Sequence, residues 1–305
     1  MSVARVGFSV VALVAFAGTA AASTTSTPPA MGAKGPAMFP YSGEVGDAMG
    51  FDCSGTVIAN CFVITARHCI MNEDNDAIRP LNDIRFRDSA GTVFPAVRVT
   101  ANVTADIAII ELDKTNGMPV ASLPNANVGL DWEFIQGNEF SFAGWGLGSN
   151  NPGPVTQNPL PAWNQGRAHR VMYNTADDLA VGPFPQQGTI FSFDFDDPAT
   201  LGMMDGAVDG EGITAPGDSG GGYYIEHEGK RYLFGVHSAG PNFPIWNSSG
   251  HIAGDPNNPM VNLTIRGSGV LLMEYKDWIK ASIPTPGTLG LASLAIVLGM
   301  RRRRA

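Results

Sequence analysis

The chain has 305 residues, of which 44% are hydrophobic and 15% are charged, and its formal net charge is −9 at pH 7. This length is enough for one large all-β domain or two small ones with a hydrophobic core, and the excess of acidic residues argues against nucleic acid or an anionic lipid surface as a partner. Three cysteines allow one disulfide bond and leave one cysteine over.

Residues 1–22 have the features of a secretory signal peptide. A lone Arg5 precedes an apolar run over 6–17, and three alanines end the segment. This pattern predicts cleavage near Ser23 and export of the mature chain, which makes a disulfide bond permissible. Residues 23–40 are small, rich in proline and without periodic pattern, so they are predicted to be a linker or pro-segment.

Short β-like runs fill most of the chain after position 41, and Gly, Pro, Asn and Asp separate them. Short strands at regular spacing favour a sandwich or barrels, so the predicted fold class is all-β. One helix is predicted, over "YKDWIKAS" at 275–282. The β-like runs are GTVIA, CFVITA, DIRFRD, TVFPAVRVTA, DIAIIEL, EFSFAGWG, HRVMYN, TIFSFDF, GGYYIEHEGKRYLFGVHS and GVLLMEY.

Three segments carry residues suited to nucleophilic catalysis: His68 in "TARHC", Asp106 in "TADIAIIEL" and Ser219 in "TAPGDSGGG". A serine hydroxyl needs an adjacent base, and a buried carboxylate beside a histidine fixes the tautomer of the ring. The small residues around Ser219 would let the backbone N–H groups of Gly217 and Ser219 converge on a developing oxyanion. Taken singly, each segment also fits a plain turn or the start of a strand.

The cysteines lie close to His68. Cys53 and Cys69 flank two β-like runs, and a bridge between them would fix the loop that carries the histidine, with Cys61 as a small hydrophobic residue in between. A zinc site is conceivable from these residues, but the paired C-x2–4-C units typical of structural zinc sites are lacking. Acidic stretches such as "NEDND" at 72–76 lack the calcium-loop pattern and are predicted to be solvated turns. No metal or other cofactor is therefore predicted.

The blocks around His68, Asp106 and Ser219, in this order, resemble the three signature segments of chymotrypsin/trypsin-type serine proteases. Other segments resemble that family too: "CSGTVIA" is similar to the strand before the histidine loop, "AGWG" to the opening of the second barrel, "GVHSAG" to the strand that pairs with substrate, and "YKDWI" to the closing helix. The likeness covers about residues 41–283.

The resemblance implies two six-stranded antiparallel β-barrels, the first over about 41–125 and the second over about 135–283, with the active site between them. It also implies a Cys53–Cys69 disulfide in the histidine loop and a hydrogen bond from Ser238 to the catalytic aspartate. The activity implied is that of a serine endopeptidase, acting as a monomer on protein or peptide substrates. A binding module that has kept the scaffold and lost turnover is the alternative.

The residues that would line the specificity pocket depart from trypsin. Ile213 stands where trypsin has an acid, so no preference for Lys or Arg is expected. Thr214 and His237 resemble the pair with which glutamyl endopeptidases receive a carboxylate, and Ser238 and Gly240 belong to the segment that contacts substrate. Two interpretations stay open: a pocket that prefers acidic residues, or a small mixed pocket with a neutral, structurally bonded His237.

The partner of Asp218 is left open by the sequence. In the resembling family this acid pairs with a new α-amine after a cut before an Ile-Val-Gly-Gly type sequence, and no such sequence stands within 23–51.

The C-terminal residues 284–305 combine a Pro-Thr-Pro turn, an apolar run over 287–300 and four arginines. A membrane span needs about 17 to 25 apolar residues, so this run is short. The tail resembles the PEP-CTERM sorting signal, which implies exosortase-like machinery beside signal peptidase, and a location at the cell envelope, the cell surface or outside the cell; a permanent short anchor is the alternative. Loss of both ends would change the formal charge to −14, because five basic residues and no acidic ones leave with them.

Overall fold

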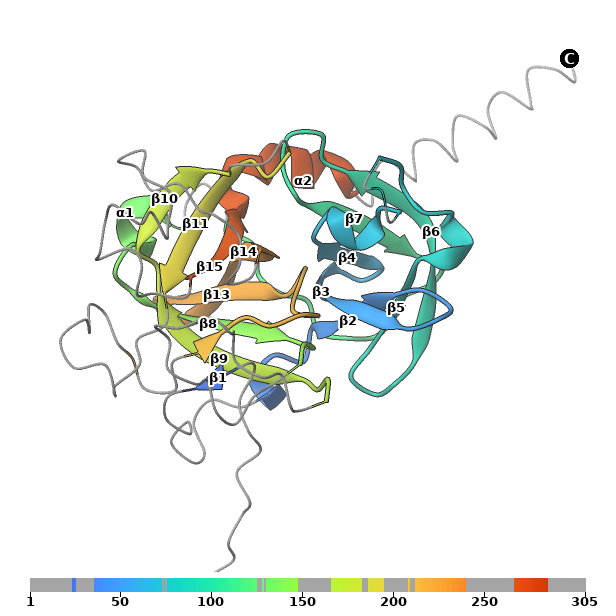
Figure 1. Ribbon diagram of the computed structural model, residues 1–305, viewed down its shortest axis with the longest axis horizontal. Coiled ribbons are helices and arrows are strands. Elements are labelled where there is room, and N and C mark those ends of the chain that lie inside the picture. Colours follow the sequence, from blue (N-terminus) through green and yellow to red (C-terminus); the bar gives the residue numbers. More distant parts are fainter. Residues whose placement is uncertain are drawn as a thin grey trace, which may run out of the picture.

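The computed structural model describes residues 24–25, 36–72, 74, 76–124, 128, 130–147, 166–182, 186–194, 208, 212–239 and 266–284. Two β units lie side by side, and the helix α2 (Lys276–Ser282) lies across their upper end (Figure 1). Arg98 of the first unit donates to the carbonyl of Ser282 at the end of this helix, so the C-terminal segment is fixed against the opposite half of the molecule.

The first unit is a closed six-stranded barrel in the order β2-β3-β4-β7-β6-β5. Its side chains alternate as expected for strands with one face in a core: in β6, Phe94 and Ala96 point inward while Val93 and Val97 are exposed. The core is mostly aliphatic and β-branched, which suits a pleated surface. The strands are β2 (Ser42–Gly46), β3 (Phe51–Ala59), β4 (Phe62–Thr65), β5 (Arg85–Arg87), β6 (Val93–Ala101) and β7 (Ala108–Leu112).

The second unit is a seven-stranded antiparallel sheet in the order β10-β11-β15-β14-β13-β8-β9. Aromatic rings dominate its core: Phe140 makes edge-to-face contacts with Phe191, Phe193, Tyr223 and Phe234. The strands are β8 (Glu139–Gly144), β9 (Arg170–Thr175), β10 (Asp178–Val181), β11 (Thr189–Asp194), β13 (Gly222–His227), β14 (Lys230–Ala239) and β15 (Arg266–Leu271).

The predicted all-β class is confirmed, and most of the β-like runs of the sequence lie in strands. The last run, GVLLMEY, ends in a 3-10 turn, and strands β2 and β10 were not among the predicted runs. The second unit differs in detail from the six-stranded barrel that was expected: it has seven strands, and its edge strands β10 and β9 are not paired with each other within the described residues. The predicted late helix is α2, preceded by a 3-10 turn, Leu272–Tyr275.

The remaining elements are short. Helix α1 (Trp132–Ile135) was not anticipated from the sequence; it begins at Asp131, whose side chain accepts from the backbone N–H of Phe134. Other 3-10 turns are Pro36–Met38, His68–Ile70 and Leu81–Asp83.

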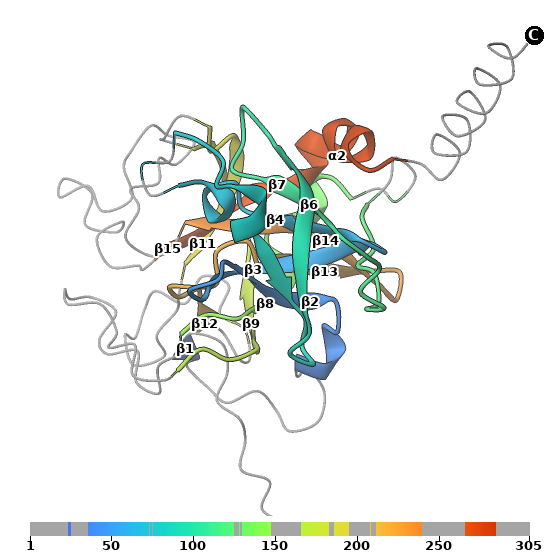
Figure 2. The same cartoon turned by 90° about the vertical axis from the view of Figure 1, so that its right-hand side faces the viewer.

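A two-stranded pairing joins the N-terminal segment to the second half of the chain. Strand β1 (Thr24–Thr25) pairs antiparallel with β12 (Gly212–Ile213), with Thr24 opposite Ile213 (Figure 2). The residues just after the predicted cleavage position therefore lie next to the strand that leads to Ser219.

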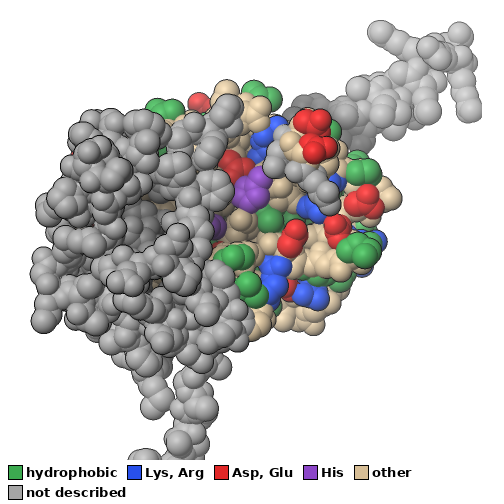
Figure 3. Space-filling view, viewed as in Figure 1, with side chains coloured by type: hydrophobic (Ala, Val, Ile, Leu, Met, Phe, Trp, Pro, Cys, Tyr) green, Lys and Arg blue, Asp and Glu red, His purple; other side chains and the backbone are tan. Residues whose placement is uncertain are grey.

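Several predictions fall on residues that the structure does not describe. These are the signal peptide, the C-terminal tail from 285 onward, and Gly240. None of the helices in the described ranges is long and apolar enough to cross a membrane. On the face shown in Figure 3, acidic and basic side chains are interspersed over the described surface.

Candidate active site

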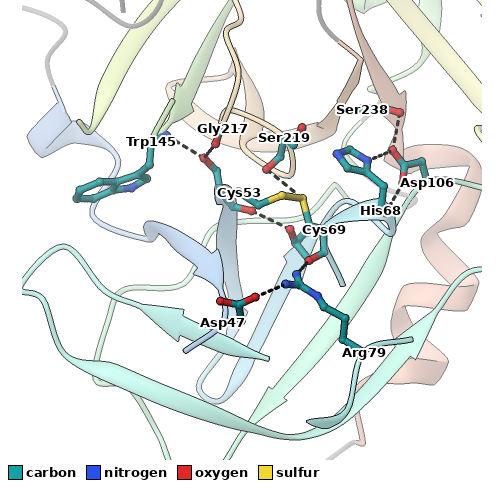
Figure 4. The surroundings of a disulfide bond; sticks show 12 residues. Asp47, Cys53, His68, Cys69, Arg79, Asp106, Trp145, Gly217, Ser219 and Ser238 are labelled. Carbon is teal, nitrogen blue, oxygen red and sulfur yellow. Dashed lines mark hydrogen bonds and ion pairs between the residues drawn. A yellow bond between two sulfur atoms is a disulfide. The ribbon is translucent and has the colours of Figure 1, made fainter. Parts of the chain in front are cut away.

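His68 begins a 3-10 turn directly after strand β4, and a disulfide fixes this turn. The predicted bond between Cys53 and Cys69 is present, and it joins β3 to the residue after His68 (Figure 4). Arg79 adds a second anchor, because its guanidinium donates to the carbonyl of Cys69 and pairs with Asp47 at 3.1 Å. The histidine therefore stands on a segment held from two sides.

Asp106 binds both the ring and the backbone of His68. The distance from His68 Nδ1 to Asp106 Oδ2 is 2.7 Å, and the His68 backbone N–H donates to Oδ1 at 2.9 Å. Ser238 Oγ of β14 donates to the same Oδ2 at 2.7 Å. Asp106 thus accepts hydrogen bonds from both β units at the interface between them.

The charges of this pair stabilise each other. Burial raises the pKa of Asp106. The charge and hydrogen bond of His68, the Ser238 hydroxyl and the His68 backbone N–H together lower it by more, so the pKa of Asp106 is below its ordinary value and the carboxyl is ionised. Burial lowers the pKa of His68, yet the charge and hydrogen bond of Asp106, with the charge of Asp52, raise it above its ordinary value. The side chain of His68 keeps an exposed fraction of 36%.

Ser219 lies on the short loop between β12 and β13. Gly217 has a φ of +97° and Gly220 a φ of +83°, conformations that residues with a Cβ rarely adopt, so the glycines allow the tight path of this loop. Asp218 is fully buried, and its carboxylate accepts from the backbone N–H of Gly146 at 2.7 Å and of Ala215 at 2.9 Å. The acid before the serine therefore fixes the loop to the end of β8.

Ser219 and His68 come from different units and lie next to each other. In Figure 4, Ser219 lies on the side of the imidazole ring that is not bonded to Asp106. The backbone carbonyl of Ser219 accepts from the N–H of Ser54 in β3 at 2.7 Å, which ties the loop to the first barrel. The three residues that the sequence singled out are thus brought together.

The predicted pocket residues are buried in the second unit. Ile213 and Thr214 have an exposed fraction of 0%, and His237 of 2%. His237 Nδ1 lies 2.7 Å from the hydroxyl of Tyr223, and the ring also hydrogen-bonds the backbone of Ser268. Burial and the charge of His68 lower the pKa of His237 to about 3. The ring is therefore neutral in the free protein.

Thr214 differs from its neighbours. The Thr214 hydroxyl lies near the hydroxyl of Tyr223. It lowers the pKa of Tyr223, whereas burial raises that pKa by more. Its Oγ1 is nevertheless buried without a hydrogen-bond partner of good geometry, so far as the described residues show. A buried hydroxyl in this state costs about 1–3 kcal/mol, so it gains from any acceptor that enters the pocket.

The part of the chain that the structure describes contains one group that could formally hold a metal ion, Cys53, His68 and Cys69. The two sulfur atoms are bonded to each other, so neither is a thiolate that could bind zinc. The remaining histidine is bonded to Asp106.

Tyr223, Arg79 and Ser54 were not identified from the sequence as part of the site. Tyr223 lies in the strand-forming run after Ser219, and its contact with His237 depends on how β13 and β14 pair. Arg79 stands in a segment with no distinctive local pattern. Ser54 lies in "CSGTVIA", which resembles a strand of the family, but that resemblance gives no sign of its contacts with the loop that carries Ser219.

A family model described as Trypsin matches residues 32–250, which is more than half of the chain and includes His68, Asp106 and Ser219. A search of curated proteins found no match.

Proposed function

Because this chain belongs to the trypsin family of serine proteases, we propose that it is an endopeptidase in which Ser219 is the nucleophile, His68 the base and Asp106 the residue that orients the base. One observation carries the proposal: Asp106 binds His68 through Nδ1, which leaves Nε2 on the side of Ser219 (Figure 4). A histidine held in this way has a lone pair at Nε2 with which it can accept the serine proton.

The reaction follows from these positions. Ser219 Oγ attacks the carbonyl carbon of the scissile bond while His68 Nε2 takes the hydroxyl proton, and the resulting imidazolium is stabilised by ionised Asp106. His68 then gives the proton to the leaving amine, and the C–N bond breaks to form an acyl-enzyme. Water hydrolyses this ester through the same proton transfers in reverse order.

The oxyanion of the tetrahedral intermediate would accept hydrogen bonds from the backbone N–H groups of Gly217 and Ser219. The positive φ of Gly217 allows its N–H to turn toward the same point as that of the serine. Each such donor is worth about a factor of 10² to 10³ in kcat in enzymes of this mechanism.

A fluorophosphonate probe tests the nucleophile. The mature protein should be labelled, and Ser219→Ala should not be labelled although it keeps the fold, as judged by circular dichroism. Peptide hydrolysis measured on the same samples separates an enzyme from the alternative, a binding module on this scaffold. An unlabelled, correctly processed wild type would leave only the binding module.

For specificity, we propose a pocket that takes a side chain with a hydrogen-bond acceptor, acidic residues first, and that does not favour Lys or Arg. Thr214 supports this, because its buried hydroxyl has no hydrogen-bond partner of good geometry among the described residues, and Ile213 supplies no negative charge for a basic side chain. His237 is neutral and bonded on both sides, so it would serve through its fixed position and would bind a carboxylate directly only after releasing Ser268.

A panel of peptide p-nitroanilides with Glu, Gln, Ala or Lys before the scissile bond tests the pocket. Glu should be cleaved fastest and Lys slowest, and Thr214→Val should remove the advantage of Glu and Gln over Ala. Equal rates for Glu and Ala would favour the small mixed pocket, and fastest cleavage after Lys would contradict the proposal.

We further propose that the protein is exported, that signal peptidase cuts near Ser23, and that exosortase-like machinery processes the tail, with the protease acting as a monomer. The pairing of Thr24–Thr25 with Gly212–Ile213 supports a cut close to Ser23, because a cut several residues further along would remove β1. N-terminal and C-terminal sequencing of the protein recovered from membrane, envelope and culture medium tests this. A first residue beyond Thr25, or recovery from the cytoplasm alone, would contradict it.

A further inference from the structure

Ser54 of the first barrel holds the backbone carbonyls of both residues whose N–H groups would form the oxyanion hole. Its N–H donates to the carbonyl of Ser219 at 2.7 Å, and its Oγ donates to the carbonyl of Gly217 at 2.8 Å. The side chain has an exposed fraction of 0%. One buried residue therefore contacts both halves of the candidate hole from the opposite β unit.

The direction of the hydroxyl proton of Ser54 is determined by its neighbours. The backbone N–H of Trp145 donates to Ser54 Oγ at 2.8 Å, so the oxygen acts as acceptor there and directs its own proton to Gly217. The carbonyl of Ser54 accepts from Thr65 Oγ1 at 2.7 Å. Every hydrogen-bonding group of Ser54 is engaged, which fixes the residue in one orientation.

Arg167 is a second donor to the same carbonyl. Its Nη2 donates to the carbonyl of Gly217 at 3.3 Å, and its Nε donates to the carbonyl of Trp145 at 3.2 Å. The guanidinium lies against Gly217 at the position that a Cβ would occupy. Gly217 and Trp145 lie on one side of Ser219, and His68 lies on the other (Figure 4).

These anchors matter because Gly217 has more backbone freedom than any other residue type would have there. The peptide unit between Pro216 and Gly217 is planar, so its N–H points away from its C=O. The N–H of Leu147 holds the Pro216 carbonyl at 2.9 Å, and Ser54 and Arg167 hold the next carbonyl along the chain. Both peptide units that flank the Gly217 Cα are thus anchored, and together these anchors fix the direction of the Gly217 N–H.

We propose that Ser54 and Arg167 are positioning residues that hold the Gly217 peptide in the orientation needed to stabilise the oxyanion. The inference rests on the proposed peptidase function. Neither side chain touches the reacting atoms, so the expected effect is on the rate of the chemical step and not on substrate binding.

The first test is Ser54→Ala, with Tyr224→Phe as the matched control. Thr56, two residues further along β3, bonds the Tyr224 hydroxyl at 2.9 Å, so Tyr224→Phe also removes one buried hydroxyl bond between the two β units but leaves Gly217 untouched. With the best p-nitroanilide of the panel, Ser54→Ala should lower kcat about 10- to 100-fold and change KM by less than about twofold. The control should keep both values within about twofold of wild type.

A second variant covers the case in which Ser54→Ala does not fold. Arg167→Met keeps an unbranched apolar stem in place of the half-buried side chain and removes both donors, and it should lower kcat by about three- to tenfold at unchanged KM. The midpoint of the acid limb of the pH profile should stay at its wild-type position in both variants, because His68 keeps its bonds to Asp106.

The outcomes separate the two proposals. If wild type is active and Ser54→Ala and Arg167→Met have the same kcat as Tyr224→Phe, the peptidase function stands and the positioning role is overturned. A loss confined to KM, or a shifted acid limb, overturns it as well. Inert wild type that fails to react with the fluorophosphonate overturns the peptidase function, and this inference with it.

Discussion

The two β units differ in how they are closed and in what fills them. The first is a closed barrel with an aliphatic core. It carries His68, whose turn is fixed by a disulfide, and the buried Asp106, which bonds the ring of His68. The second is a seven-stranded sheet with a ring-rich core, and it carries Ser219 on a glycine loop. The proposed acid–base pair thus stands on the unit with the covalent constraint, and the proposed nucleophile stands on the unit that contains the candidate specificity residues.

Hydrogen bonds between the two units, and not only contacts within each unit, hold the residues of the candidate site together. Ser238 of the second unit bonds Asp106 of the first, and Ser54 of the first bonds the loop of the second. Each unit supplies a buried serine that hydrogen-bonds a candidate site segment of the other unit.

Breaking the acid–base pair of the first unit should have the largest effect. Asp106→Asn removes the charge that holds the His68 tautomer, and kcat should fall by about 10⁴. Burial then acts on His68 against only the smaller effect of the Asp52 charge, so the pKa of His68 should fall, and the acid limb of the residual activity should move to lower pH than in wild type. A pH series of kcat/KM measures both, and an acid limb that moves upward would contradict this account.

The next largest effect is expected on stability, and it differs between the two cores. Phe140 contacts four rings in the second unit, whereas Phe86 of the first barrel is equally buried and makes no ring contact with the described residues. Phe140→Leu should therefore lower the free energy of unfolding by about 1 to 3 kcal/mol more than Phe86→Leu. Ring pairs contribute about 0.5–1.5 kcal/mol each, and four pairs that share one ring contribute less than their sum. Urea denaturation of the two variants measures the difference, and equal losses would show that the ring contacts add nothing beyond burial.

The smallest effect is expected from loss of the hydrogen bond that Ser238 of the second unit donates to Asp106 of the first. In wild type, His68 must be neutral to act as base, so activity should rise with pH through a midpoint above 6.5, the ordinary pKa of histidine. Ser238→Ala removes one donor from Asp106, which strengthens the interaction of the carboxylate with imidazolium, so the midpoint should move slightly upward and kcat should fall less than about tenfold. Ser141→Ala, which removes a buried hydroxyl bond within the second unit, is the control and should leave the pH profile unchanged.

Much of the site could be predicted because its residues stand in unusual local sequences. Ser219 is surrounded by glycines, and His68 is followed at once by a cysteine. The pocket was predicted less completely. Thr214 and His237 were identified by position, yet burial and the charge of His68 make His237 neutral, and its hydrogen-bond partner Tyr223 is a residue that the pattern of β13 marks only as a strand residue.

The sequence by itself determined the all-β class, most of the strands and the three catalytic candidates, since alternation and glycine-rich loops are local features that backbone sterics translate directly into structure. Only the tertiary structure decided that the second unit has seven strands and that Ser54 supports Gly217, 163 positions further along the chain. Hydrogen bonds between distant backbone groups depend on how the two units pack, and they leave no pattern in the neighbouring residues.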